Sequence, residues 1–315
     1  MFWDVVLLIV GMALLIKGAD WFVDGASKIA RAMKIPSLII GLTLVSIGTS
    51  APEFSVSVTA AIRGENDISF GNIIGSNIFN TFLVIGASAL FTTLVVSKNM
   101  KKYDLPILIA IYLLLFLFAF AITPNIVSRW ESIIIFLLTI VYTVFLIIRS
   151  KNEEPVEEIE NKTKWYMNVL FLVLGLAGII LGGDLVVDSA SNIAKELGMS
   201  ELLVGLTIVA VGTSLPELVT SMVAAKKGEN DIAVGNAIGS CIFNVILILG
   251  VSGIILPVSV AWSSMLDVIV MLVSGVTIIV MTLKSNKIEK IKGIILILMY
   301  IAYLTYIIIR ELGVL

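Results

Sequence analysis

The stretch that decides the fold is Gly48-Thr49-Ser50-Ala51-Pro52-Glu53, which recurs as Gly212-Thr213-Ser214-Leu215-Pro216-Glu217. Each copy places a proline, two hydroxyls and a carboxylate inside an apolar run of membrane length. An ionisable side chain at that depth is costly, so it is a functional-site hypothesis by default. The fixed separation of the two copies strengthens this hypothesis.

Composition indicates a membrane protein. Of the 315 residues, 59% are hydrophobic and 14% are charged, whereas a soluble domain is about 45–50% apolar and about 25% charged. We therefore expect an all-α integral membrane protein. The beginning of the chain has no basic region and no small-residue cleavage site, so the first apolar run is interpreted as a retained transmembrane helix.

Ten apolar segments are long enough to cross a bilayer, which takes about 20 residues. They are predicted at 3–24, 37–62, 68–96, 104–123, 130–149, 166–190, 201–225, 232–257, 262–283 and 291–310. The first and sixth should continue as helices past the membrane, through Arg31 and Lys195. The charged segment 150–164 is predicted to be a solvated linker between a first repeat, 1–149, and a second repeat, 165–315.

The two halves are related by a shift of 164 residues. Over 41–80 against 205–244, about 25 of 40 positions are identical without gaps, which indicates a duplication. Each half has five predicted spans, an odd number, so the second half must enter the membrane from the opposite side. This is the inverted-topology repeat of many secondary transporters, in which the binding site lies near the midplane between the repeats.

Positive charge predicts the orientation, because cytoplasmic loops carry an excess of Lys and Arg. With the N-terminus outside, sixteen Lys and Arg residues fall on the inside and four on the outside, while Lys17 lies within the first span. We therefore expect a multi-pass plasma-membrane protein with an external N-terminus and a cytoplasmic linker.

The proline of each motif predicts a break in its helix. Pro52 has no N–H to donate to the carbonyl of Gly48, and its ring crowds that carbonyl. The backbone carbonyls from Ser46 onward should therefore be freed, which is tolerated at membrane depth only inside protein or along a water-filled cavity. Thr49 and Glu53 are four residues apart and share a helix face. The seventh span repeats the arrangement with Ala210, Thr213, Ser214 and Glu217.

A polar stripe with four-residue spacing follows each motif. It comprises Asn72, Ser76 and Asn80 in the third span and Asn236, Ser240 and Asn244 in the eighth. We predict that Ser76, Asn80, Ser240 and Asn244 belong to the site, because they stand near the motif carboxylates in both repeats. For Asn72 and Asn236, a role in the site and a role in helix packing are equally open.

The available ligands point to a hard cation. The chain has no histidine and one cysteine, and oxygen ligands suit hard cations rather than zinc or copper. One divalent cation, or two monovalent ones, would neutralise the two buried carboxylates. Ca²⁺ accepts 6–8 oxygens in flexible geometry, whereas Mg²⁺ gives up its water reluctantly, so Ca²⁺ is the better candidate for transport. A site that binds either Na⁺ or Ca²⁺ is a physical basis for exchange.

Four aspartates lie toward the ends of the first and sixth spans, at positions related by the same shift. They are expected to be interfacial or to pair with Lys17, Lys28 or the backbone, and the alternative is that they line an entrance to the site. They are Asp20, Asp24, Asp184 and Asp188.

These motifs carry a family resemblance. Gly-Thr-Ser-x-Pro-Glu, followed by Gly-Asn-x-Ile-Gly-Ser-x-Ile-x-Asn, occurs in both halves and resembles the α-repeats of the sodium/calcium exchanger family of cation/Ca²⁺ antiporters. The resemblance implies two inverted five-helix repeats, with the site in spans 2, 3, 7 and 8 and with spans 1 and 6 sliding across it. It also implies exchange of Na⁺ for Ca²⁺, usually three for one.

The resemblance further implies a set of ion ligands. Glu53 and Glu217 would be the central ligands, and Ser46 and Ala210 would contribute backbone carbonyls. Hydroxyl, amide and further carbonyl oxygens would come from Thr49, Ser50, Thr213, Ser214, Ser76, Ser240, Asn80 and Asn244.

Several alternatives are weighed against Na⁺/Ca²⁺ exchange. Potassium-dependent members of the family carry Asp where Asn244 stands, and the Ca²⁺/H⁺ branch typically has a Glu-His pair that this chain lacks, although its carboxylates could themselves carry protons. The inverted repeat argues against a channel, and the absence of a histidine partner for Ser50 and Ser214 argues against a protease. We expect no enzymatic activity and no cofactor. The expected partners are Na⁺, Ca²⁺ and the bilayer, without nucleic acid, and a monomer would suffice.

Overall fold

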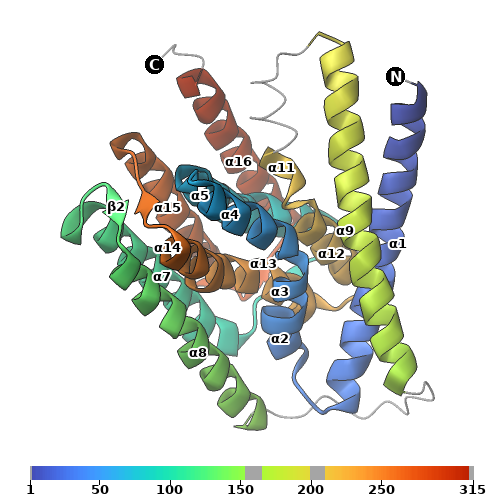
Figure 1. Ribbon diagram of the computed structural model, residues 1–315. Helices are drawn as coiled ribbons and strands as arrows, with labels where there is room; N and C mark the ends of the chain where they lie inside the picture. The colour runs from blue at the N-terminus through green and yellow to red at the C-terminus, as the bar shows by residue number, and fades with distance from the viewer. Residues whose placement is uncertain (1, 153–164, 199–209, 312–315) are drawn as a thin grey trace.

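The computed structural model describes residues 2–152, 165–198 and 210–311. Most of the predicted linker, and residues 201–209 of the predicted seventh span, lie outside the described residues. The N-terminal end of α1 (Phe2–Ala32) and the linker-flanking ends of α8 (Arg129–Asn152) and α9 (Trp165–Glu196) lie at opposite ends of the molecule (Figure 1).

Long helices make up nearly all of the described chain. The other α-helices of the first half are α2 (Ser37–Ile40), α3 (Ser46–Thr49), α4 (Ala51–Arg63), α5 (Asn66–Phe79), α6 (Ile85–Phe91) and α7 (Leu105–Phe116). Those of the second half are α11 (Ala210–Gly212), α12 (Leu215–Lys226), α13 (Asn230–Phe243), α14 (Gly250–Ile255), α15 (Met265–Thr282) and α16 (Lys290–Glu311). Short π-helical segments continue several of them, namely η1 (Gly41–Val45), η2 (Asn80–Val84), η3 (Met100–Asp104), η4 (Leu117–Ile122) and η6 (Asn244–Leu249), and η7 (Trp262–Ser264) is a 3₁₀ turn.

The predicted spans correspond to these helices. Within the described residues, eight helices are long and apolar enough to cross a membrane, and a ninth span is formed if the bent pair 37–49 and 51–63 counts as one. Of the predicted seventh span, the described part is α11 and α12. The first and sixth spans continue as predicted, since α1 ends at Ala32 and α9 at Glu196.

Two short antiparallel ribbons are an exception to the all-helical expectation. β1 (Leu94–Val95) pairs with β4 (Lys287–Ile288), and β2 (Ile126–Val127) pairs with β3 (Val258–Ser259). Each ribbon therefore joins one strand from each half of the chain. Two-residue strands have too little sequence for a recognisable alternating pattern, which is why these ribbons were not predicted.

α1 and α9 form an antiparallel pair at one edge of the molecule (Figure 1). Asn192 near the end of α9 donates a hydrogen bond of 3.1 Å to Asp4 near the start of α1. Glycines allow the two backbones to approach closely. A Cβ atom on Gly175 would lie 2.4 Å from the backbone nitrogen of Phe22 and 2.7 Å from the carbonyl oxygen of Gly18.

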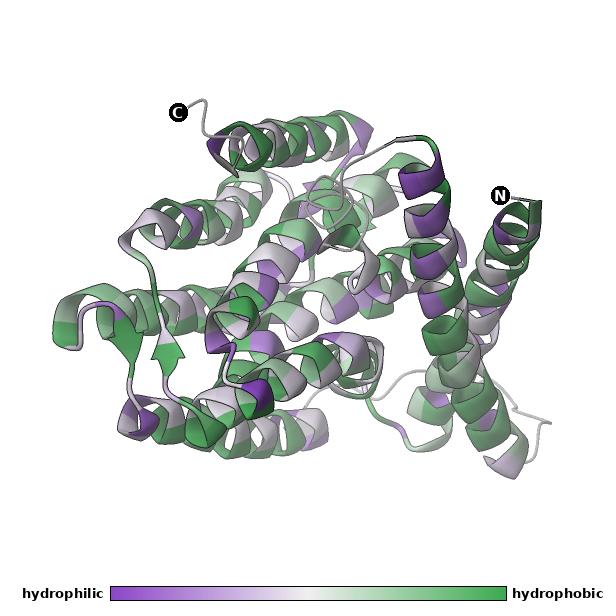
Figure 2. Ribbon diagram, turned by 45° about the horizontal axis from the view of Figure 1, so that its top comes forward, coloured by the Kyte–Doolittle hydropathy of each residue, from purple (hydrophilic) through white to green (hydrophobic). Residues whose placement is uncertain are grey.

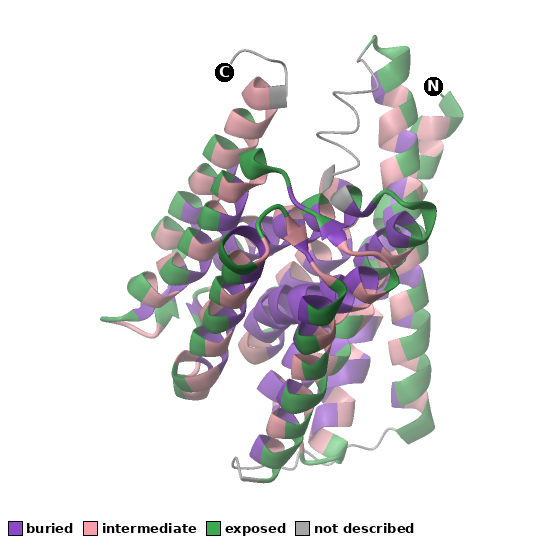
Figure 3. Ribbon diagram, turned by 60° about the vertical axis from the view of Figure 1, so that its left-hand side comes forward, coloured by how far each residue is buried: buried purple, intermediate pink, exposed green. Residues whose placement is uncertain are grey.

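The core is formed around α5 and α13. In the spans that contain them, 78% of the residues in the most apolar window are buried, against 17–44% in the other long helices. Figure 3 shows these buried residues gathered in the middle of the molecule. Figure 2 shows hydrophobic residues over most of the outer helices, as expected for helices that face lipid. The two most buried spans are those that carry the predicted polar stripes.

An ion pair with a tyrosine ties the last two spans of each half together. In the first half, Arg149 lies 2.8 Å from Asp104, which also accepts a hydrogen bond of 3.2 Å from Tyr142. In the second half, the same chemistry recurs, since Arg310 lies 3.0 Å from the carboxylate of Asp267, which accepts a hydrogen bond of 3.3 Å from the hydroxyl of Tyr303. The repeat therefore extends beyond the motif-bearing spans.

Candidate functional site

The two motif copies form the two helix breaks that the prolines predict. α3 ends at Thr49 and α4 begins at Ala51, and the helix axes differ by 50° across Ser50. Pro52 then lies in the first turn of α4, where the missing N–H of proline is tolerated. Glu53 therefore lies at a helix N-terminus, where the helix dipole favours a negative charge. Glu217 holds the same position in α12.

The hydroxyls of the two breaks reach across to the opposite carboxylates. Ser50 donates a hydrogen bond of 2.7 Å to Glu217, and Ser214 donates one of 2.9 Å to Glu53. Both glutamates are completely buried. Each carboxylate is thus contacted by a hydroxyl from the other half of the chain.

Serines of the polar stripes complete each carboxylate's surroundings. Ser76 on α5 lies 3.4 Å from Glu53, and Ser240 on α13 lies 3.4 Å from Glu217. The hydroxyl oxygens of Ser214 and Ser76 lie 3.0 Å apart, a distance at which Ser214 can accept a hydrogen bond from Ser76. The structure therefore brings Glu53, Glu217 and four of the predicted serines into one cluster at the centre of the molecule.

Asn72 and Asn236 connect the two helix breaks to the polar stripes on α5 and α13 through hydrogen bonds. The hydroxyl of Thr49 donates a hydrogen bond of 2.9 Å to the side-chain oxygen of Asn236, and Thr213 lies 3.5 Å from that of Asn72. Each amide nitrogen in turn donates to a serine of the neighbouring helix, Asn72 to Ser57 (3.0 Å) and Asn236 to Ser221 (2.9 Å). The 164-residue repeat relates Ser57 to Ser221, so the shift would have identified both serines from the sequence.

Asn80 and Asn244 mark the point where α5 and α13 change to π-helix. η2 begins at Asn80 and η6 at Asn244, and short π-helical segments are frequent at functional sites. Asn244 donates a hydrogen bond of 3.0 Å to Asn77. The equivalent of Asn77 in the second half is Cys241, whose thiol is a poor replacement for an amide oxygen. This difference explains why the amide of Asn80 has no matching bond.

Several buried polar atoms of this cluster lack a partner among the described residues. They are the second carboxylate oxygen of Glu53 and of Glu217, both amide atoms of Asn80, and the side-chain oxygen of Asn244. A buried polar atom without a partner costs roughly 1–3 kcal/mol, and more if it is charged. Four of these atoms are oxygens of the kind that hard cations bind. The cluster therefore fits a cation.

The backbone contribution differs in detail from the prediction. The carbonyl of Ser46 is not left without donors, because it accepts the Ser50 N–H at 3.0 Å and the Ser240 hydroxyl at 3.4 Å. The α-helical bond from the Ser50 N–H to the Ser46 carbonyl therefore survives at the break. Ala210 is the first residue described after 199–209, and its carbonyl stays a predicted ligand.

Carboxylates alone do not make this site. In the described part of the chain, no three His, Cys, Asp or Glu side chains gather into a metal-binding group.

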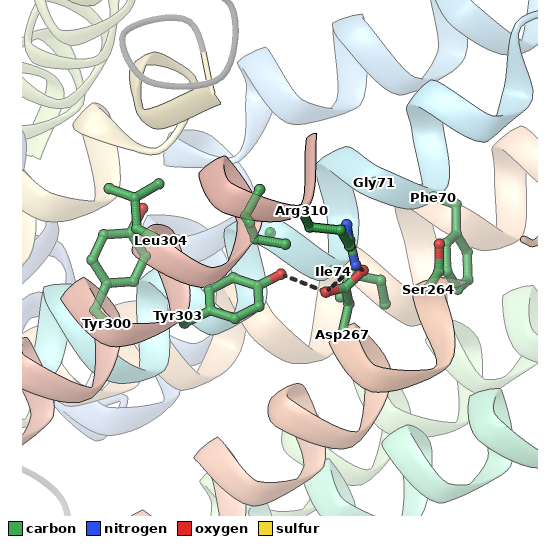
Figure 4. Close-up of a pocket in the computed structure, with 11 residues that line it drawn as sticks. Phe70, Gly71, Ile74, Ser264, Asp267, Tyr300, Tyr303, Leu304 and Arg310 are labelled. Atoms are coloured by element: carbon green, nitrogen blue, oxygen red, sulfur yellow. Dashed lines mark hydrogen bonds and ion pairs between the residues drawn. The ribbon is translucent and has the colours of Figure 1, made fainter. Parts of the chain in front are cut away.

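A separate cavity of about 270 Å³ lies between α5, α15 and α16, beside the Asp267–Arg310 pair (Figure 4). The residues that line this cavity include none of the predicted ligands. A multi-pass helical protein with paired glutamates and unpartnered oxygens at its centre belongs to the class of ion-transporting membrane proteins.

Comparisons with known proteins give the family. The family model described as sodium/calcium exchanger protein matches residues 3–148 and 167–309. The chain belongs to the sodium/calcium exchanger family. It is 41% identical to "Putative antiporter CaxA" of Alkalimonas amylolytica, over 90% of this chain and 91% of that one. It is 34% identical to "Sodium/calcium exchanger MaX1" of Methanosarcina acetivorans, over 82% and 85%. A solved structure of the sodium-calcium exchanger NCX_Mj matches with a TM-score of 0.85 at 30% identity, covering 97% of this chain and 98% of that one.

Proposed function

We propose that this protein exchanges Na⁺ for Ca²⁺ across the membrane by alternating access to the central cluster. The observation that carries the proposal is the crossed pair of hydrogen bonds, Ser50 to Glu217 and Ser214 to Glu53. Among the described residues, one oxygen of each buried carboxylate is left without a partner. The two carboxylates thus lie in one cluster to which both halves of the chain contribute.

The proposed ligands divide by chemistry. Glu53 and Glu217 supply the charge, and the backbone carbonyls of Ser46 and Ala210 supply neutral oxygens. The remaining oxygens come from Thr49, Ser50, Thr213, Ser214, Ser76, Ser240, Asn80 and Asn244. One Ca²⁺ is neutralised by the two glutamates together. Two Na⁺ would be neutralised equally well, with any further Na⁺ held by neutral oxygens, so the two loads compete for one set of ligands.

The absence of a third carboxylate favours this exchange over the related ones. Position 244 is an asparagine whose amide donates to Asn77, so it adds no charge for an additional monovalent cation. A proton-coupled or potassium-dependent exchanger on the same scaffold is the alternative that the transport experiment must distinguish.

The proposed topology places the N-terminus outside the cell and the linker in the cytoplasm of a plasma-membrane protein. The positions of the N-terminus and of the linker-flanking helix ends at opposite ends of the molecule support it (Figure 1). We propose two repeats, 1–149 and 165–315, with 150–164 as linker, and a monomer as the transporting unit.

The test is Ca²⁺ uptake into vesicles that contain the purified protein, with voltage and pH clamped. Vesicles loaded with Na⁺ are diluted into Na⁺-free or Na⁺-containing buffer, and the same is done with K⁺ in place of internal Na⁺. Uptake only with an outward Na⁺ gradient supports the proposal. Uptake that ignores Na⁺ and follows a pH gradient would replace it with Ca²⁺/H⁺ exchange.

A further inference from the structure

A group of charged side chains joins α1 to the turn between α12 and α13. Lys227 in that turn lies 2.7 Å from Asp20 and 2.6 Å from Asp24. Two residues further on, Glu229 lies 2.7 Å from Arg31 and accepts a hydrogen bond of 2.6 Å from Ser27. We call these six interacting residues the first latch: Asp20, Asp24, Ser27, Arg31, Lys227 and Glu229. The sequence suggested Lys17, Lys28 or the backbone as partners for these aspartates. Asp20 does contact Lys17 at 2.8 Å, whereas Asp24 pairs with Lys227.

The same six kinds of side chain recur at the positions related by the repeat. The shift of 164 residues relates the first latch to a second set, which consists of Asp184, Asp188, Ser191, Lys195, Arg63 and Glu65. Acid, hydroxyl and base are preserved at every one of the six positions. The two turns also share their backbone, since Gly64 and Gly228 have φ angles of +85° and +81°. The duplication has therefore kept a complete second copy of the latch chemistry.

Five residues of the second set do not make the contacts that their equivalents make in the first latch, as far as the described residues show: Asp184, Asp188, Ser191, Arg63 and Glu65. Among the described residues, neither Asp184 nor Asp188 has an ion pair, and both Arg63 and Glu65 are exposed. The hydroxyl of Ser191 is buried and finds no hydrogen-bond partner in the described part of the chain, whereas its equivalent Ser27 donates to Glu229. The two ends of the α1–α9 pair therefore differ, although their residues match.

α1 and α9 are packed closely against each other along their length. The backbone contacts at Gly18, Gly175 and Gly182 leave no room for a Cβ atom. The first latch joins the C-terminal half of α1 to the turn between α12 and α13. The second set is divided between the C-terminal half of α9 and the turn between α4 and α5. In an inverted repeat, a transporter changes its open side when the two halves exchange conformations.

We propose that the two sets are alternating latches, which close in turn as the α1–α9 pair moves and so determine the face to which the central site opens. Breaking the first latch and forming the second are two halves of one step. This inference rests on the proposed transport function for its purpose, but it concerns a movement that can be measured without any transported ion.

The movement can be followed with two matched pairs of spin labels. Met33 and Lys226 flank the first latch, and their equivalents, Leu197 and Ile62, flank the second set. All four side chains are exposed, and the native Cys241 is fully buried, so protein without introduced cysteines gives the background. Pulsed EPR distances are recorded for the double variants Met33→Cys with Lys226→Cys and Leu197→Cys with Ile62→Cys, in the purified full chain in lipid.

Glu229→Gln is combined with each label pair, and Glu65→Gln serves as its matched opposite. We expect Glu229→Gln to lengthen the 33–226 distance and shorten the 62–197 distance, and Glu65→Gln to do the reverse. The ratio of the two populations should change by about tenfold, the effect of losing one hydrogen bond to a charged group. Arg31→Glu should act like Glu229→Gln, and the double variant Arg31→Glu with Glu229→Arg should restore the original distances.

Two results would overturn the proposal. If neither distance changes in Glu229→Gln, Lys227→Met or Glu65→Gln protein that elutes as a single folded species, the residues are ordinary surface charges. If both distances lengthen together, the charged residues stabilise the packing of the protein at both ends and do not alternate. A third result separates this proposal from the proposed function. If one distance lengthens while the other shortens, but the protein shows no Na⁺-driven Ca²⁺ uptake, the alternating latches are supported and the proposed ions are refuted.

Discussion

Ser50 and Glu217 are 167 residues apart in the chain, yet the Ser50 hydroxyl donates a hydrogen bond of 2.7 Å to the Glu217 carboxylate. Ser214 and Glu53 repeat this contact at 2.9 Å. Neither half of the chain completes its own carboxylate environment, because the shorter hydroxyl contact comes from the other half, whereas the serine of the same half lies at 3.4 Å. The site therefore exists only when both repeats are docked.

The two glutamates should be equally indispensable. In Glu53→Gln and Glu217→Gln, one of the two negative charges is lost, and we expect Na⁺-driven Ca²⁺ uptake to fall by about a hundredfold or more. A bound Ca²⁺ would then keep one uncompensated positive charge, and breaking a buried ion pair typically costs about 3–5 kcal/mol. Uptake into vesicles measures the effect, with the exposed Glu289 changed to Gln as control. Full transport in either glutamate variant would contradict the assignment of the site.

The crossed hydroxyls should have matching effects. Ser50→Ala and Ser214→Ala each remove a donor to a buried carboxylate and a proposed ligand oxygen, at a cost of roughly 1.5–3 kcal/mol for a bond to a charged group. We expect each variant to weaken the apparent affinity for Ca²⁺ by about tenfold or more, measured as the half-saturating Ca²⁺ concentration for uptake. Ser55→Ala, on the exposed side of α4, is the control. A large effect in one variant alone would show that the two halves do not contribute alike.

Much of this site follows from spacing along single helices. The break at Pro52 and the shared face of Ser76 and Asn80 need only local geometry and the repeat. The partners across the site do not, because a contact such as that between Thr49 and Asn236 depends on how distant helices cross. The role of Asn236 was open in the sequence for this reason, and the structure shows it as a connection between a helix break and its neighbour.

The asymmetry between the halves was also beyond the sequence. Comparing Asn77 with Cys241 identifies a substitution, but its consequence depends on Asn244 being within 3.0 Å of Asn77. Likewise, the repeat predicts that Asp24 and Asp188 are equivalent, and only the structure shows that Asp24 is paired with Lys227, whereas Asp188 has no ion pair among the described residues. A duplicated sequence specifies the shared chemistry, whereas a conformation can engage one copy at a time.

Close packing of α1 against α9 should tolerate no added methyl group. In Gly175→Ala, the new Cβ would lie 2.4 Å from backbone, which cannot yield as a flexible side chain can. We expect the two helices to separate, with loss of transport and a lower unfolding temperature. Gly71→Ala is the matched control, because nothing lies within 4 Å of its Cβ position, and a helical alanine is favourable by about 0.5–1 kcal/mol. Equal behaviour of the two variants would refute the close-packed pair.

The ion pair between Asp104 and Arg149 should matter for stability rather than for transport selectivity. Both side chains are almost fully buried, so Arg149→Met leaves a carboxylate in the core without its charge partner, at a cost of about 3–5 kcal/mol. The double variant Asp104→Leu with Arg149→Met should regain most of that loss, because replacing a whole buried pair by apolar residues is often neutral.

The second half offers the matched comparison for this prediction. The pair of Asp267 and Arg310 has the same chemistry but is more exposed, with side-chain exposures of 10% and 23%. Water can therefore solvate the remaining carboxylate in Arg310→Met, and its unfolding temperature should fall less than that of Arg149→Met. Thermal unfolding of the purified variants in one detergent, followed by tryptophan fluorescence, makes the comparison. An equal or larger loss in Arg310→Met would mean that burial does not set the cost of breaking these pairs.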